Sequence, residues 1–245
     1  MTRTTMFGIE VPHAMPCDKS QSKWTKLHGV YDFAHPRGVF EVHLRSGGRF
    51  FAPKFPEKSK WKCTNECCAD GKTCCHLQIE WGKYGQYALE MDEASVPPCC
   101  SGSVKGNPEN WRKMTMKRPF TPQELKLMDS EWTLEHPGGS FAVEFHADGL
   151  NSFVCNMFPT KASWSVEDAE SGNPTVFIHW GKYGEYELKM APDGESMAGS
   201  AKGNPAEWRR AARLWGLDKK PLTKRGREEA CGGCKKGCGE CGRED

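Results

Sequence analysis

Apolar and polar residues alternate in several short stretches of this chain, and the stretches fall into two similar sets. The first set lies at residues 40–44, 77–81 and 87–91, and the second at residues 141–145, 176–180 and 186–190. A period of two is typical of a β-strand with one buried face and one face toward solvent. Turn sequences such as Gly47-Gly48 and Asp148-Gly149 separate the stretches and predict antiparallel hairpins.

The pentapeptide WGKYG occurs twice, beginning at Trp81 and at Trp180. The alternating residues after it repeat as well, and each copy is preceded by a His-Pro pair, at residues 35–36 and 136–137. Two matching sets in the same order indicate an internal duplication, so we expect two similar domains. Because WGKYG stands between two alternating stretches, it predicts a hairpin turn whose glycines take positive φ.

The predicted fold class is all-β, with two tandem antiparallel β-meander domains at residues 29–114 and 130–215. About six or seven short strands in each domain must close into a small barrel or fold over as a sandwich to protect the edges. In plan the domains resemble the calycins, and the resemblance covers architecture alone. Outside the domains we expect an N-terminal arm at residues 1–28, a linker at 115–129, and a basic, cysteine-rich tail at 216–245.

Each domain is predicted to close with a short helix. Asn107 and Asn204 are favourable N-caps, and the proline after each of them suits the first helical position. In the linker, the sequence Thr-Pro-Gln-Glu at residues 121–124 has the form of a capping box. This motif predicts a short linker helix that ends at about residue 128.

The composition narrows the class of protein without pointing to a reaction. The chain has 245 residues, 37% of them hydrophobic and 27% charged, with a formal net charge of +2. These values suit a soluble globular protein and argue against general electrostatic binding of nucleic acid. The first residues have no apolar run typical of a signal peptide, and no run approaches the ~20 apolar residues of a membrane helix. We therefore expect a soluble intracellular protein of the cytoplasm or nucleus, without membrane insertion.

The thirteen cysteines are distributed unequally between the repeats. Cys155 lies in the second repeat where the first has Ala52, so the shared fold does not require cysteine. The first repeat contains Cys63, Cys67, Cys68, Cys74, Cys75, Cys99 and Cys100. We expect the loop cysteines before residue 76 and the Cys99-Cys100 pair at the same end of the domain, because antiparallel strands return there. Clustered thiolates bind soft ions, so zinc or another thiophilic metal is the expected cofactor, with His76 as a further ligand.

Two other interpretations of the first-repeat cysteines stay open. Disulfide bonds would staple the loop, which requires an oxidising compartment. Alternatively, the cysteines are free thiols in the loop and have no chemical role.

The C-terminal tail holds two CxxC pairs, Cys231/Cys234 and Cys238/Cys241. Each pair can wrap one face of a tetrahedral ion, which favours a small metal clip. The same spacing allows dithiol–disulfide chemistry as the second interpretation. Before the clip, residues 219–227 are rich in lysine and arginine. A solvated linker, a nuclear-import signal or a weak contact with an anionic partner such as nucleic acid would explain them.

Three pairs of equivalent residues form the predicted ligand or partner surface. They are Lys83 and Lys182, Trp111 and Trp208, and Arg112 and Arg209. An arginine in such a position can stack on an aromatic ring or bind an anion. Packing and solvation are the competing explanation for each pair.

No catalytic signature accompanies these residues. The sequence lacks HExxH, GxSxG and a phosphate-cradling glycine loop before a helix. We therefore expect a non-enzymatic binding protein that holds a thiophilic metal ion and, on its β domains, a small ligand or a protein partner. The alternatives are a structural or adaptor subunit of a larger assembly and a thiol redox protein that uses the CxxC tail.

Overall fold

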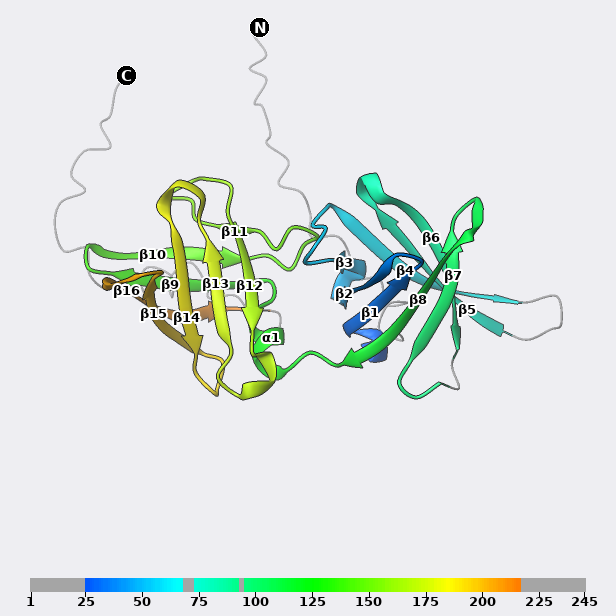
Figure 1. The fold of residues 1–245 in the computed structure, drawn as a ribbon. Helices are drawn as coiled ribbons and strands as arrows, with labels where there is room; N and C mark the ends of the chain where they lie inside the picture. The colour runs from blue at the N-terminus through cyan, green and yellow to red at the C-terminus, as the bar shows by residue number, and fades with distance from the viewer. Residues whose placement is uncertain (1–24, 68–72, 93–94, 217–245) are drawn as a thin grey trace, which may run out of the picture.

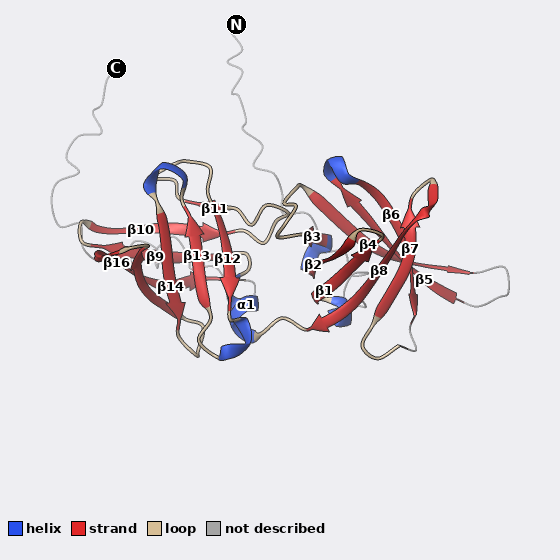
Figure 2. Cartoon of the chain, viewed as in Figure 1, coloured by secondary structure: helices blue, strands red, loops and turns tan. Residues whose placement is uncertain are grey.

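The computed structural model describes residues 25–67, 73–92 and 95–216, and within these ranges the chain is almost wholly β (Figure 1). Two eight-stranded antiparallel units follow one another and are joined by a linker that contains a short helix (Figure 2). The predicted all-β class with two tandem meander domains is confirmed. Of the two closures left open by the sequence, barrel and sandwich, the structure shows barrels.

The first unit is a closed up-and-down barrel. Its strands are β1 (Gly29–His35), β2 (Gly38–Arg45), β3 (Arg49–Phe51), β4 (Ser59–Cys67), β5 (Thr73–Trp81), β6 (Gly85–Asp92), β7 (Cys99–Val104) and β8 (Asn107–Arg118). Each strand pairs with the next, and β8 returns to pair with β1. Closure satisfies the backbone groups that an open sheet would expose at its two edges.

The second unit repeats this order almost completely. Its strands are β9 (Ser130–His136), β10 (Gly139–Phe145), β11 (Phe153–Val154), β12 (Ser163–Glu167), β13 (Thr175–His179), β14 (Glu185–Met190), β15 (Ser196–Ala201) and β16 (Asn204–Trp215). β16 pairs with β9 as β8 pairs with β1. A bridge between Ser152 and Ser163 links the β11 and β12 edges, so the second barrel is nearly closed.

Side chains fill the interior of each barrel in the alternation that the sequence predicts. In β5, Leu77, Ile79 and Trp81 are buried while Glu80 is exposed. The equivalent residues of β13 are buried in the same way. Each fully buried aliphatic or aromatic side chain contributes about 1.5–3 kcal/mol, so these inward rows hold the barrels together.

The two WGKYG sequences form equivalent hairpin turns, as predicted. The three residues after the tryptophan make one 3-10 turn in each copy, Gly82–Tyr84 and Gly181–Tyr183. The following glycines have φ of 104° at Gly85 and 100° at Gly184. Because other residues rarely adopt this region, the turn requires glycine there.

The predicted closing helices are wrong, because these segments form β8 and β16. The turn before β8 has Gly106 at φ 81° and places Asn107 opposite Val104. β8 then pairs with both β7 and β1. A helix there would leave two strand edges unpaired, so tertiary pairing overrides the local capping signal.

The predicted linker helix is confirmed as α1 (Pro122–Leu127). Thr121 Oγ1 accepts a hydrogen bond from the Glu124 backbone N–H (3.3 Å), and Glu124 Oε2 accepts one from the Thr121 N–H (2.8 Å). Arg118 donates to both oxygens of the same carboxylate, at 2.7 and 3.0 Å. None of the helical segments in the described ranges has the length and apolar character of a membrane span.

The barrels pack against each other through the linker and the outer face of β1. Val30 of β1, Phe120, Leu127 and Met128 belong to the buried apolar cluster of the second barrel. The Glu57 N–H also donates to the Gly149 carbonyl of the second barrel (3.1 Å). These contacts make the two barrels one packed unit.

A buried arginine crosses the interface. Arg45, at the end of β2, is 2% exposed, and its guanidinium lies over the rings of Phe51 (4.5 Å) and Trp164 (5.6 Å). It donates to the Asn151 side chain and to the Asp148 carbonyl of the second barrel. We call Arg45, with Trp164, Asn151 and Asp148, the Arg45 latch.

Candidate functional site

The residues shared by the two repeats gather at one end of each barrel. In the first barrel, the segments 35–38, 52–58, 82–84 and 105–112 contain the strand connections at this end together with the first residues of β8, and we call them the first rim. The second rim consists of the equivalent segments 136–139, 155–162, 181–183 and 202–209. The duplication therefore provides two versions of one site in a single chain.

Aromatic rings close each barrel beneath its rim. In the first barrel, the Trp81 ring contacts Phe40 (5.8 Å), Tyr84 (5.0 Å) and Tyr87 (6.0 Å). Trp180 makes the corresponding contacts in the second barrel, with Phe141, Tyr183 and Tyr186. These rings, together with the buried rows below them, leave the barrel interiors filled by side chains.

An arginine stacks on an inward tyrosine in both rims. The Arg112 guanidinium lies 5.3 Å from the centre of the Tyr87 ring, and Arg209 lies 4.7 Å from that of Tyr186. Across the sheet, Arg112 pairs with Gly102, which has no side chain to compete for this space. Both arginines therefore stack on a neighbouring aromatic residue, which is one of the two roles that the sequence suggested for them.

The predicted lysines follow the same pattern at the turn. Lys83 Nζ lies 5.3 Å from the Tyr84 ring centre, and Lys182 Nζ lies 5.1 Å from that of Tyr183. Lys83 is also 3.8 Å from the Glu57 carboxylate. Each lysine thus adds a cation to the aromatic rim while its head remains accessible.

Hydrogen bonds tie the stacked tyrosines to the turn. The Tyr87 hydroxyl donates to the Tyr84 carbonyl (2.8 Å), and the Tyr186 hydroxyl donates to the Tyr183 carbonyl (2.7 Å). The tyrosine ring that supports the arginine is therefore fixed relative to WGKYG. This link explains why turn and strand residues repeat together.

The partner of the arginine differs between the rims. Arg112 Nη1 donates to the Asn110 side chain (2.6 Å), whereas Arg209 donates to the Glu207 carboxylate from both terminal nitrogens (3.3 Å each). The sequence interpretation missed this pair. The signal was available in the two repeats, because the residue two positions before the arginine is neutral in one and acidic in the other.

The predicted tryptophans point away from the barrel interiors. Trp111 is 46% exposed and pairs across the sheet with Ser103, while Trp208 is 39% exposed and pairs with Ser200. Tryptophan is on average a highly buried residue type. Two exposed tryptophans at equivalent positions are therefore an unusual surface feature that the rims share.

The shared histidines have a structural role. His35 Nδ1 accepts from the Arg37 N–H (3.4 Å), and His136 Nδ1 accepts from the Gly138 N–H (3.3 Å). The His35 ring packs on Phe40, and the His136 ring packs on Phe141. Burial lowers the pKa of His35, and the nearby charges of Arg112 and Arg37 lower it further. A neutral imidazole suits this acceptor role.

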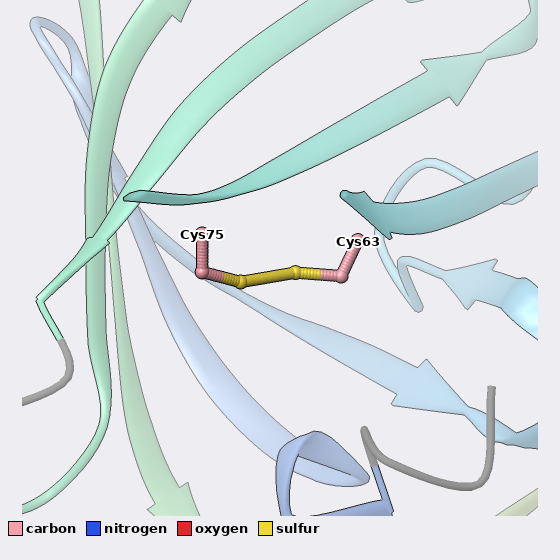
Figure 3. Close-up of a disulfide and its surroundings, with 2 residues drawn as sticks. All are labelled: Cys63 and Cys75. Atoms are coloured by element: carbon pink, nitrogen blue, oxygen red, sulfur yellow. A yellow bond between two sulfur atoms is a disulfide. The ribbon is translucent and has the colours of Figure 1, made fainter. Parts of the chain in front are cut away.

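The structure joins two of the predicted metal ligands to each other. Cys63 of β4 and Cys75 of β5 form a disulfide inside the first barrel (Figure 3). For these two residues the structure agrees with the disulfide interpretation. While the bond is present they cannot bind a metal as thiolates, because a disulfide sulfur is not a thiolate ligand. Cys155 is a buried free thiol in the second barrel.

Cys67, Cys74, Cys99 and Cys100 belong to strands at the end of the first barrel opposite the rim. β4 ends at Cys67, and β7 begins with Cys99 and Cys100. Cys100 is buried, and burial raises the pKa of its thiol to about 12, with the neighbouring Cys99 adding to the shift. Within the described ranges, no group of three or more histidine, cysteine or acidic side chains is arranged to hold a metal ion. Cys68 and the tail cysteines Cys231, Cys234, Cys238 and Cys241 lie outside these ranges, as does the basic segment 219–227.

A cavity of about 500 Å³ lies between the barrels. Its wall includes Glu41, His43, Arg118 and Glu124 on one side and Trp164 on the other. The polar groups pair within this wall: Glu41 with the His43 imidazole (2.9 Å) and Glu124 with Arg118 (2.7 Å). We regard this cavity as part of the interface that holds the two barrels together, and not as a ligand site. The sequence could not predict it, because it arises only when the two domains dock.

Comparisons of the chain with known protein families, with curated protein sequences and with solved structures find no match. The repeated rims therefore carry the functional argument.

Proposed function

We propose that the chain is a non-enzymatic binding protein whose two rims bind segments of a protein partner. The observation that carries the proposal is the pair of exposed tryptophans at equivalent positions, Trp111 and Trp208. Tryptophan, tyrosine and arginine are the residue types most enriched where binding energy concentrates in protein interfaces. Each rim combines all three.

The filled barrels support binding on the outside. The buried cluster of the first barrel runs from Trp81 at the rim to Cys100 toward the other end. A ligand in the interior would have to displace these side chains, whereas an exposed tryptophan needs no such rearrangement. A partner that covers each tryptophan would remove its apolar surface from water.

Cations beside the tryptophans suggest the character of the partner. Lys113 follows Trp111 on the same outward face of β8, and Arg210 follows Trp208 on β16, with its guanidinium 5.4 Å from the Trp208 ring centre. A segment that mixes apolar and acidic side chains matches such a surface. We propose this chemistry for the partner.

Peptide selection on the purified full chain tests the proposal. A displayed library of random peptides is selected against the wild-type chain, and the affinities of the selected peptides are measured for Trp111→Ala, Trp208→Ala and the double variant. We expect each single change to weaken binding at least tenfold and the double variant to lose it.

Leu125→Ala is the matched control. Leu125 is 52% exposed on α1, outside both rims. Its replacement is expected to leave binding unchanged. Peptides that bind all variants equally, or a selection without enrichment, would refute the proposal.

We also propose that the cysteine loop binds a thiophilic ion, with the tail clip as a second site. One observation supports the first site: the end of β4, the start of β5 and the start of β7 lie at the same end of the barrel, as the antiparallel order requires. Thiols from both segments can therefore meet there when Cys63 and Cys75 are reduced. Zinc is the proposed ion because clustered thiolates favour it.

Zinc and thiol analysis of anaerobically purified protein tests this second proposal. We expect the wild-type protein to contain bound zinc and the double variant Cys99→Ser with Cys100→Ser to contain less. Truncation of the chain after Arg227 should lower the zinc content further. Metal-free protein with all thiols titratable would rule out both sites. Metal-free protein with few free thiols would instead support disulfide staples.

A further inference from the structure

We infer that the first rim, and not the second, binds a carboxylate of the acidic partner segment, with Arg112 as the residue that recognises it. The inference rests on the proposed function and adds a difference between the two barrels. It starts from the two arginines that stack on equivalent tyrosines but have different partners.

One edge of the Arg112 guanidinium is already bound. Nη1 donates to the Asn110 side chain (2.6 Å), to the Asn110 carbonyl (3.2 Å) and to the Trp111 carbonyl (2.7 Å). Among the residues that the structure describes, Nε and Nη2 have no hydrogen-bond partner. The side chain is half-buried, so its position is fixed while this second edge remains accessible.

The second rim uses the same arginine differently. Arg209 is 8% exposed, and its Nη2 donates to the Tyr186 hydroxyl (3.2 Å) and to Glu207 (3.3 Å). Glu207 therefore pairs with Arg209 at the edge formed by its two terminal nitrogens, and Arg209 Nε is buried. An external carboxylate would meet a guanidinium whose charge is already paired and whose Nε edge is closed to solvent.

The charge around Arg112 favours an anion. Segments of the first rim carry the cations Arg37, Lys54, Lys58, Lys83 and Lys105, against the acids Glu57 and Glu109. Asn110 adds no charge, so the positive field at Arg112 is not cancelled by its nearest side-chain partner. Electrostatic complementarity of this kind selects partners and speeds association.

A carboxylate fits the accessible edge in geometry as well as in charge. The Nε and Nη2 hydrogens of a guanidinium point in parallel and match the two oxygens of a carboxylate. Stacking on Tyr87 fixes the plane of the guanidinium, which lowers the entropy lost on binding. The ligand class is therefore an aspartate or glutamate side chain of the partner, placed beside an apolar group that covers Trp111.

The duplication supplies a reciprocal test. The probe is a labelled synthetic peptide that repeats Glu-Trp-Glu, and the reference is the same peptide with glutamine in place of glutamate. Their affinities are measured by fluorescence anisotropy for the wild-type full chain, Asn110→Glu, and Glu207→Asn. Asn110→Gln is the matched control, because it changes side-chain size as Asn110→Glu does without adding charge.

We expect Asn110→Glu to weaken binding of the glutamate peptide at least tenfold and to leave the affinity for the glutamine peptide unchanged. Asn110→Gln should bind like wild type, and Glu207→Asn should create a second site for the glutamate peptide. Arg112→Gln serves as a second variant with the same expected loss, so the inference is tested even where Asn110→Glu perturbs folding. Circular dichroism confirms that each compared variant is folded.

Other outcomes separate the inference from the proposed function. If Asn110→Glu and Arg112→Gln keep the wild-type preference for glutamate while Trp111→Ala loses binding, the inference is wrong and the proposed function stands. If Trp111→Ala binds like wild type, the proposed function fails. If single-stranded oligothymidylate binds more tightly than the glutamate peptide and depends on Arg112, the occupant is a nucleic acid, which overturns the inference.

Discussion

At the scale of single residues, the duplication shows which contacts the barrels share and which they have changed. Both copies keep a tyrosine whose hydroxyl bonds to the turn and whose ring supports an arginine. The second copy adds a bond from Arg209 to the Tyr186 hydroxyl (3.2 Å). The same tyrosine therefore has a larger structural role in the second barrel.

Phenylalanine substitutions should reveal this difference. We expect Tyr87→Phe to lower the free energy of unfolding by about 0.5–1.5 kcal/mol, because the turn carbonyl loses one hydrogen bond. Tyr186→Phe should lower the free energy of unfolding by a larger amount, because the buried Arg209 loses a hydrogen-bond partner as well. Urea unfolding of the full chain, followed by tryptophan fluorescence, measures both changes. Equal losses would show that the Arg209 bond contributes nothing to stability.

At the scale of elements, strands with apolar inward residues could be predicted from the sequence. The two strands that close the barrels could not, because their inward residues are not all apolar. In β16 the buried positions are Arg209, Ala211 and Arg213, and the exposed ones between them include Arg210. Arginines on both faces hide the period of two, and the Asn-Pro start then favours a helix.

The rim residues were predictable in identity but not in arrangement. Repetition alone singled out the lysines, tryptophans and arginines. Their stacking partners follow from strand register, which places Arg112 beside Gly102 and two strands away from Tyr87. The Arg45 latch could not be found by comparing the repeats, because Arg45 is not repeated. Its equivalent in the second repeat is His146.

The linker helix depends on its capping box. Replacing Thr121 by alanine removes the side-chain acceptor for the Glu124 N–H, and we expect a loss of about 0.5–2 kcal/mol. Thr121→Ser keeps the hydroxyl and should retain most of the stability. Thermal unfolding monitored by circular dichroism gives the comparison. A loss of the same size in Thr121→Ser would assign the effect to the methyl group instead.

At the scale of the whole molecule, a neutral histidine supports the Arg45 latch. His43 Nδ1 faces Arg45 Nη2 (3.2 Å), and His43 Nε2 faces Glu41 (2.9 Å). Because arginine cannot accept a hydrogen bond, Nδ1 is the acceptor and Nε2 carries the proton. The rings of Phe51 and Phe120 pack on the same imidazole.

Acid should therefore weaken the packed unit. Burial lowers the pKa of His43 from 6.5, and Arg45 lowers it further, although Glu41 and Glu124 act in the opposite direction. The folded-state pKa is thus below the unfolded value, and the unfolded chain binds more protons near pH 6. Stability is full above about pH 6.5 and falls as the pH decreases below that value.

Urea unfolding between pH 7.5 and pH 5.5 measures this dependence. The wild-type free energy of unfolding should fall over the range, and His43→Gln, which cannot titrate, should show a smaller slope. The other histidines are common to both proteins, so the difference in slope belongs to His43. Identical slopes would mean that protonation of His43 does not reach the latch.

The Arg45 latch also sets the distance between the two rims, and this has a consequence for avidity. Sites on a flexible tether sample many separations, whereas sites on one packed unit accept a second segment only when the spacer in the partner matches a single span. A partner with that spacer gains from a high effective concentration after its first segment binds, and one with a shorter spacer gains nothing. The latch would therefore make the chain a selector of spacing as well as of sequence.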